Sequence, residues 1–228
     1  MPMYRAVNKD FFKKWTPEMA YVLGFFAADG YITVNRRGGQ FWCIQITDRE
    51  LLENIRTTIG SHHKIGLRKR FGNAKNSYSL QIGSIDMCND LRTLGFTERK
   101  SKNLPVRKVP NKYFPDFVRG YFDGDGNVWV GNMHKETKIP RQALLTAFTS
   151  CSTDFLRLLL KELNKNGIEG GSVYVSKKNY SRLQFGTRDS LKLYDFMYNQ
   201  STSSDLQLFR KKVVFEKFQI KRKHAVVV

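Results

Sequence analysis

The feature that most restricts the fold of this chain is an internal repeat. Residues 20–30 read AYVLGFFAADG and residues 116–126 read DFVRGYFDGDG, with glycines, an aromatic pair and a final Asp-Gly at matching positions. A second pair, YSLQIGS at 78–84 and YSRLQFGT at 180–187, follows in the same order. Self-similarity at this scale indicates a duplicated structural unit. We therefore expect two similar halves.

Each half begins with an apolar helix that ends at an Asp-Gly pair. Thr16 is suited to cap the first helix, because Pro17 then occupies its first turn. In the second half, Pro115 is placed to occupy the first turn of the corresponding helix. At the other end, Gly30 and Gly126 would tolerate a left-handed turn out of the helix. The two helices should therefore have matching starts and matching ends.

The segments after each helix alternate between apolar and polar residues, which is the period of a half-buried strand. Two adjacent glycines, at 38 and 39, favour a tight turn before the strand at 40–47, and Thr47 to Glu50 resembles a capping box. Further strands are expected around 65–68, 77–82, 127–133, 141–149, 172–177 and 181–186. Shorter helices are expected at 48–59, 85–94, 153–165 and 188–198.

This order of elements predicts an α+β fold made of two pseudo-symmetric αββαββα half-domains with antiparallel sheets. We place the half-domains at residues 1–103 and 113–228, joined by a short proline-bearing linker at 104–112. The first helices carry small residues four apart, Gly24 with Ala28 and Gly120 with Gly124, so each presents a small-residue face. Such faces allow two parallel helices to pack backbone to backbone.

The charge of the chain indicates a polyanionic partner. It has 39 Lys and Arg against 20 Asp and Glu, a formal net charge of +19. An excess of this size repels itself in a compact fold, and nucleic acid is the leading candidate for compensating it. No run of roughly 18 apolar residues is present, so we expect no membrane span. Charged residues near the N-terminus favour an intracellular protein, cytoplasmic or in an organellar matrix, and not a secreted one.

Asp29 and Asp125 are the residues on which the functional prediction depends. Side-by-side packing of the two first helices brings both carboxylates to the same end, where they cannot both stay ionised without a cation. Mg²⁺ prefers carboxylate and carbonyl oxygens, and the backbone carbonyls of Ala28 and Gly124 lie next to the acids. Metal ions held there could stabilise the attacking and leaving oxygens of a phosphoryl displacement.

With these residues, the two segments resemble the paired signature of the LAGLIDADG homing endonucleases in their single-chain, two-motif form, over roughly residues 15–220. The resemblance implies a monomeric intron-homing endonuclease that makes a staggered break with short 3′ overhangs in a long asymmetric double-stranded DNA target. It implies Mg²⁺ as cofactor, with Mn²⁺ as a substitute and Ca²⁺ as a non-cleaving mimic, and two saddle-shaped sheets that lie on the DNA.

The same resemblance assigns residues around the acids. Asp29 and Asp125 are the metal-binding catalytic acids, and the carbonyls of Ala28 and Gly124 are further ligands. Peripheral catalytic lysines map onto Lys100 and Lys211, and water-positioning residues onto Asp48 and onto Ser150 or Ser152, although Asp48 and Ser152 are equally good helix caps. On the outward strand faces and turns, the expected DNA-binding residues are Arg36, Arg37, Gln40, Gln45, Arg68, Arg70, Ser79, Gln81, Lys135, Arg141, Lys177, Arg182 and Gln184.

Two alternatives stay open at this stage. A maturase of the same fold would bind the RNA of its host intron, and a DNA-binding regulator would have lost cleavage. The earlier acidic position of the motif holds Asp123 in the second half but Ala27 in the first. Because both final aspartates are intact, we favour an active enzyme. The three cysteines have no CxxC spacing, which argues against a zinc site or a disulfide framework.

Overall fold

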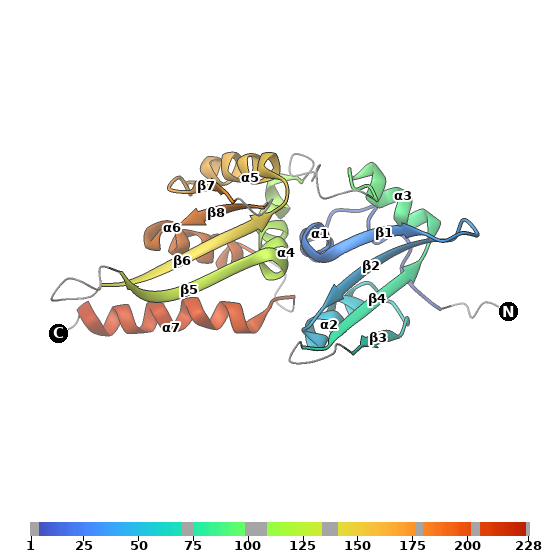
Figure 1. The fold of residues 1–228 in the computed structure, drawn as a ribbon, viewed down its shortest axis with the longest axis horizontal. Helices are drawn as coiled ribbons and strands as arrows, with labels where there is room; N and C mark the ends of the chain where they lie inside the picture. Colours follow the sequence, from blue (N-terminus) through green and yellow to red (C-terminus); the bar gives the residue numbers. More distant parts are fainter. Residues whose placement is uncertain are drawn as a thin grey trace.

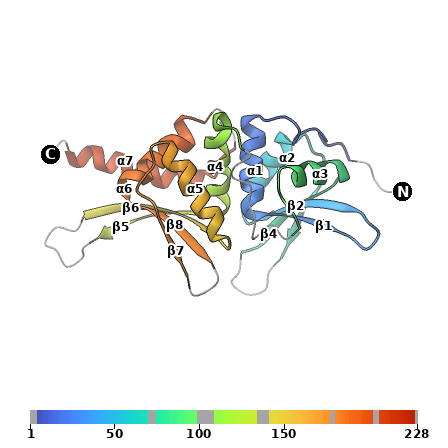
Figure 2. The ribbon, with the colours of Figure 1, turned by 90° about the horizontal axis from the view of Figure 1, so that it is seen from above.

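The structure contains two four-stranded antiparallel sheets, one from each half of the chain (Figure 1). It is a computed structural model, and it describes residues 5–69, 75–98, 109–133, 141–176, 180–201 and 206–226. Each sheet carries helices on one side, and the first helix of each half lies at the centre of the molecule (Figure 2).

The first half consists of α1 (Pro17–Asp29), β1 (Gly30–Val34), β2 (Gln40–Ile46), α2 (Arg49–Thr58), β3 (Ile65–Arg68), β4 (Ser77–Gly83) and α3 (Ile85–Thr93). Its strands pair in the order β1-β2-β4-β3, so that two hairpins join through their second strands. The turn between β1 and β2 closes with a hydrogen bond from Asn35 N to Gly39 O, and Gly38 has a φ of 79°. The glycines of this turn therefore serve the purpose expected of them.

The second half repeats this plan. It consists of a 3-10 turn η3 (Asn111–Tyr113), α4 (Phe114–Asp125), β5 (Gly126–Met133), β6 (Arg141–Ser150), α5 (Thr153–Lys165), β7 (Ser172–Val175), β8 (Ser181–Phe185), α6 (Thr187–Tyr194), a π-helical turn η4 (Asp195–Asn199) and α7 (Phe209–Val226). The strand order β5-β6-β8-β7 matches that of the first sheet. The predicted α+β class with two repeated halves is confirmed.

One element was not expected. The helix α7 adds an eighteen-residue segment to the αββαββα plan of the second half and runs along β5 (Figure 1). The helix expected at 188–198 is divided into α6 and the π-helical turn η4. Of the expected linker, residues 104–108 lie outside the described residues, so the domain boundaries stay a prediction. No described helix combines the length and apolarity needed to cross a membrane.

The strands alternate between a face packed against helices and an open face. On β2, Trp42 and Ile44 are fully buried in the core beneath α2 and α3, whereas Phe41 and Gln45 lie on the other face and are partly exposed. The second sheet alternates in the same way. Each half therefore leaves one sheet face for a partner.

Two local expectations about the helices need correction. The helix α2 is capped by Asp48, whose side chain accepts from Leu51 N, and not by Thr47. The glycines after α1 and α4 are extended, with φ of −91° at Gly30 and −85° at Gly126, so neither makes a left-handed turn. Glycine is needed there because a side chain has no room: a Cβ at Gly30 would lie 2.0 Å from the ring of Phe26.

Cys43 and Cys88 are buried free cysteines, and Cys151 is an exposed one. The N-cap expected at Thr16 is confirmed, because its side chain accepts a hydrogen bond from Met19 N at 3.1 Å.

Candidate active site between the two repeats

The helices α1 and α4 touch backbone to backbone, and two glycines make this possible. A Cβ on Gly24 would lie 2.0 Å from the carbonyl oxygen of Phe117, and a Cβ on Gly120 would lie 2.0 Å from that of Tyr21. In the repeat, Gly24 matches Gly120 and Tyr21 matches Phe117, so each helix makes the same contact with the other. No side chain fits between the helices, which explains the small residues four apart.

The contact continues to the ends of both helices. A Cβ on Gly124 would lie 2.3 Å from the Ala28 methyl group and 3.2 Å from Oδ2 of Asp29. Because the contacts advance in the same direction along both chains, the helices are parallel, as expected (Figure 2). Asp29 of the first half therefore reaches the end of α4, where Asp125 is the last residue.

Both aspartates act on the same neighbouring groups. The carboxylates of Asp125 and Asp29 each raise the pKa of Tyr121, after burial, which is the main cause of its upward shift. Both also raise the pKa of Lys211, although burial outweighs the carboxylates and lowers that pKa to about 8. The structure thus brings Asp29 and Asp125 from separate halves to one end of the helix pair.

Lys211, from the first turn of α7, closes the end of α4. It is 7% exposed, and its Nζ donates to the carbonyl oxygens of Phe122 at 2.7 Å, Asp123 at 2.8 Å and Gly126 at 2.6 Å, with a longer contact of 3.4 Å to Gly124. The last carbonyls of a helix have no partner within the helix, so a buried ammonium group satisfies them. Lys211 therefore fixes the backbone that carries Asp125, and its expected catalytic part stays a prediction.

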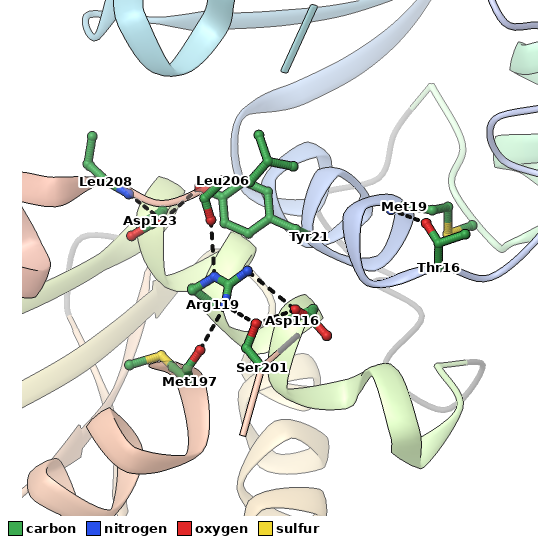
Figure 3. Close-up of polar contacts among 10 residues, drawn as sticks. All are labelled: Thr16, Met19, Tyr21, Asp116, Arg119, Asp123, Met197, Ser201, Leu206 and Leu208. Atoms are coloured by element: carbon green, nitrogen blue, oxygen red, sulfur yellow. Dashed lines mark hydrogen bonds and ion pairs between the residues drawn. The ribbon is translucent and has the colours of Figure 1, made fainter. Parts of the chain in front are cut away.

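Asp123, the earlier acidic position of the motif, has a buried structural role. Its Oδ2 accepts from the Tyr21 hydroxyl at 2.7 Å and from Leu208 N at 2.8 Å (Figure 3). Burial is the main cause that raises its pKa to about 6. In the first half Ala27 stands at this position, so the repeat is asymmetric here.

A buried ion pair supports the same region. Arg119 pairs with Asp116 at 3.3 Å and donates to the carbonyl oxygens of Met197 and Leu206, and Ser201 contacts both charged groups (Figure 3). The pair ties α4 to the segment that leads into α7 and so holds α7 in place.

A cleft of about 200 Å³ lies beside Asp29, and both halves line it. Asp29, Thr47 and Ser77 come from the first half, and Gly124 and Arg210 come from the second. Arg210 is a functional candidate that the sequence did not single out. The signal was present, since Arg210 precedes Lys211 in the run FRKK.

The donors at this place fit a hard divalent cation. The two carboxylates and the carbonyl oxygens of Ala28 and Gly124 are oxygen ligands of the kind that Mg²⁺ prefers. Among the described residues, no group of three or more His, Cys, Asp or Glu side chains could hold a metal. A cation here would thus rely on the paired aspartates, backbone oxygens, and water or phosphate oxygens from a substrate.

Two of the three residues expected to position water act as helix caps. Asp48 caps α2, Ser152 caps α5 through Phe155 N, and Ser150 accepts from Ser152 N at 3.1 Å. These bonds occupy the side chains structurally, and their roles toward water stay predictions. Lys100 lies outside the described residues.

The described strand residues of the first sheet that are expected to bind DNA lie on its open face, with one exception. Gln45 donates to Ser77 and accepts from Arg68 along that face. Ser79 and Gln81 alternate with buried residues on β4, and Arg36 and Arg37 lie in the exposed turn after β1. The exception is Gln40, which accepts from Arg92 of α3 at 2.7 Å on the helix-covered side. Gln40 therefore lies on the face opposite to the other strand residues, and its contact with DNA stays a prediction.

In the second sheet, Arg182 and Gln184 lie on the open face, because they alternate with the buried Leu183 and Phe185. Arg141 lies in β6 opposite Met133, and its side chain is not described. Arg70, Lys135 and Lys177 lie outside the described residues.

Comparisons with known proteins agree with this arrangement. Residues 16–95 match the family model of the LAGLIDADG-like domain. The uncharacterised protein MJ0398 of Methanocaldococcus jannaschii is 22% identical over 190 residues, which are 78% of this chain and 64% of that protein. The chain thus spans less than two thirds of this relative's length.

Solved structures match over both halves. The LAGLIDADG meganuclease I-AabMI, bound to uncleaved DNA, has a TM-score of 0.64 at 16% identity, covering 92% of this chain and 93% of that one. The LAGLIDADG homing endonuclease I-LtrWI, bound to target DNA, has a TM-score of 0.57 at 13% identity, covering 94% and 92%. I-SmaMI, bound to an uncleaved DNA target with calcium ions, has a TM-score of 0.53 at 15% identity, covering 81% and 85%. The chain therefore carries a LAGLIDADG-like domain in its first half and has, over both halves, the fold of the single-chain LAGLIDADG homing endonucleases.

Proposed function

We propose that this protein is a site-specific endodeoxyribonuclease that makes a staggered double-strand break, with short 3′ overhangs, in a long asymmetric DNA target. The observation that carries the proposal is the convergence of Asp29 and Asp125. They come from different repeats, meet at the end of two parallel helices, and act on the same two groups, Tyr121 and Lys211. A packing role explains the glycines between the helices, but it does not require that both helices end in an acid.

Asp29, Asp125 and the carbonyl oxygens of Ala28 and Gly124 would hold Mg²⁺. When bound, the cation supplies charge stabilisation for the phosphodiester and lowers the pKa of the attacking water. The chain itself holds these ligands in place. Lys211 fixes the end of α4 through four backbone contacts, so the Gly124 carbonyl and Asp125 stay aligned with Asp29.

The open sheet faces bind the DNA in this proposal. A net charge of +19 matches a polyanion, and open-face side chains such as Gln45, Gln81, Arg182 and Gln184 can pair with base edges in the major groove. Arg210 lies in the cleft with Asp29 and can contact a backbone phosphate there. Since the two halves differ in sequence, one chain suffices and the target is asymmetric.

The experiment is selection of cleaved sites from a randomised DNA library with Mg²⁺, with Ca²⁺ as the non-cleaving arm. The variants Asp29→Asn and Asp125→Asn should each lose double-strand cleavage while still binding the selected site. Asp154→Asn, which changes an exposed acid on α5, is the matched control and should cleave normally. Full cleavage by Asp29→Asn would refute the shared site. Sequence-specific binding without cleavage by the unaltered chain would instead favour a DNA-binding regulator.

A further inference from the structure

A groove of about 810 Å³ lies over the outer end of the first sheet. Ser79 and Gln81 of β4 form part of its floor, and both lie on the open face expected to meet DNA. The groove is therefore continuous with the proposed DNA surface but extends it past the edge strand β3, toward the N-terminal segment.

Two glycines shape the floor of the groove. A Cβ on Gly83 would lie 3.0 Å from the Phe41 ring, and a Cβ on Gly66 would lie 3.1 Å from the Ser79 hydroxyl oxygen. Larger residues at these two positions would project into the groove and fill it. Their absence allows a strand of DNA backbone to approach the sheet closely.

The rim of the groove is basic. Arg5, Lys9, His63 and Lys64 all line it. The pKa of His63 is lowered, mainly by burial and further by the positive charge of Arg5. Arg5 is therefore close enough to His63 to act on its imidazole. Lys9 also pairs with Asp86 at 3.7 Å, so part of its charge is already compensated.

The rim is held in place by the backbone. His62 N donates to Ala6 O at 2.9 Å, and Asn8 N donates to Ile59 O at 3.3 Å, so the N-terminal segment is attached to the loop before β3. The Ser61 hydroxyl contacts Nδ1 of His63 at 2.9 Å, which fixes the orientation of the ring. A site fixed in advance loses less conformational entropy when it binds.

The repeat supplies an internal comparison. The loops after α2 and α5 both turn through a glycine with positive φ, 63° at Gly60 and 78° at Gly167. Counted from these glycines, His63 and Lys64 correspond to Gly170 and Gly171. A Cβ on Gly170 would lie 2.2 Å from Oδ2 of Asp189, an acid whose counterpart in the first half is Asp86, the partner of Lys9. The histidine and lysine of this rim thus belong to the first half, and the second half has glycines in their places.

We propose that this groove, with Arg5, His63 and Lys64 at its rim, binds backbone phosphates of the target DNA beyond the base pairs read by the first sheet. The proposal rests on the proposed function, because it assigns the outer end of the same DNA-binding surface. It implies that the protein contacts more DNA on the side of its first half than on the side of its second.

The test uses the full chain and the selected target site. Affinity is measured against salt concentration for the unaltered protein, for Arg5→Gln/Lys64→Gln, and for Arg157→Gln/Lys161→Gln. The control pair removes the same charges from α5, whose opposite face (Phe155, Leu156, Leu159 and Leu163) packs inward. Losing two phosphate contacts should reduce the slope of log K against log salt by about 2 and the affinity about tenfold. The control should change neither, and unfolding midpoints should stay the same for all three proteins.

A second measurement locates the contact on the DNA. Outer base pairs are removed from one end of the target and then from the other. Removal at the end that the groove contacts should weaken the unaltered protein but not Arg5→Gln/Lys64→Gln, and removal at the other end should affect both equally. An unchanged affinity and salt slope in that variant, in a protein that still cleaves its target, would overturn the groove and leave the proposed function intact. A loss confined to structured RNA would overturn the assignment to DNA. Absence of any DNA binding by the unaltered chain would mean that the proposed function itself fails.

Discussion

The Tyr21 hydroxyl donates a hydrogen bond to Oδ2 of Asp123 at 2.7 Å, and both side chains are fully buried between α1 and α4. Leu208 N donates to the same oxygen at 2.8 Å. The carboxylate thus joins the first half, the second half and the start of α7. The same α7 carries Lys211 to the end of α4 and Arg210 to the cleft, so this contact links the stability of the interface to the geometry of the candidate site.

We predict that Tyr21→Phe destabilises the protein by about 1–3 kcal/mol, since a buried acceptor loses its donor while packing is kept. Urea unfolding measures this change. Tyr180→Phe, at a partly exposed tyrosine, is the control and should lie within about 0.5 kcal/mol of the unaltered protein. Equal stability of Tyr21→Phe and the unaltered protein would mean that the bond adds nothing to the interface.

A pH dependence follows from the raised pKa of Asp123. Burial holds it at about 6, above the ordinary 3.8, so the folded state keeps a proton that the unfolded chain releases first. The contribution of Asp123 to stability should therefore be largest below pH 4, fall as pH rises from 4 to 6 by at most about 3 kcal/mol, and change no further above 6. Asp123→Asn should remove this fall. Unfolding in metal-free buffer at several pH values measures it, and a difference between the two proteins that does not depend on pH would contradict it.

The closeness of α1 and α4 gives a steric prediction. Gly24→Ala would place a methyl group 2.0 Å from the Phe117 carbonyl oxygen, and backbone on both sides has little freedom to move. We expect a loss of about 3 kcal/mol or more, or failure to fold. Gly186→Ala is the matched control, because nothing lies within 4 Å and its φ is −77°. It should cost no more than about 1 kcal/mol. Both are compared by circular dichroism and urea unfolding, and a stable, compact Gly24→Ala would show that the helices can separate.

Much of the fold could be predicted because the sequence contains an internal repeat, so that each half gives independent evidence for the same elements. Each helix end, hairpin and strand in one half had a counterpart that supported it, and the Asp29–Asp125 pairing follows from the repeat combined with small residues on one helix face. The conformation of Gly30 could not be predicted, since it is set by the position of the Phe26 ring in three dimensions. The hydrogen bond that Gln40 accepts from Arg92 on the helix-covered side follows from strand alternation, because Gln40 lies one residue out of phase with the open-face residues Phe41 and Gln45.

The helix α7 was missed for a related reason. A surface helix is recognised by an apolar stripe, but Lys211 lies on its buried side and interrupts that stripe. A lysine is buried here only because the end of α4 offers carbonyl oxygens, which no pattern within residues 209–226 can reveal. The choice between Arg210 and Lys211 as the residue facing the cleft depends on the same helix phase.

The last prediction concerns Arg210, which lines the cleft with Asp29 while its neighbour Lys211 is buried. If its guanidinium contacts the phosphate near the cleavage position, Arg210→Gln should lower the single-turnover cleavage rate at saturating DNA by about 10²-fold, with target affinity within a few fold. Arg210→Lys should recover part of the rate, because the charge is restored without the planar fork. Lys217→Gln, at an exposed position of the same helix, should cleave normally. A loss of affinity with an unchanged rate at saturation would instead place Arg210 among the residues that only bind DNA.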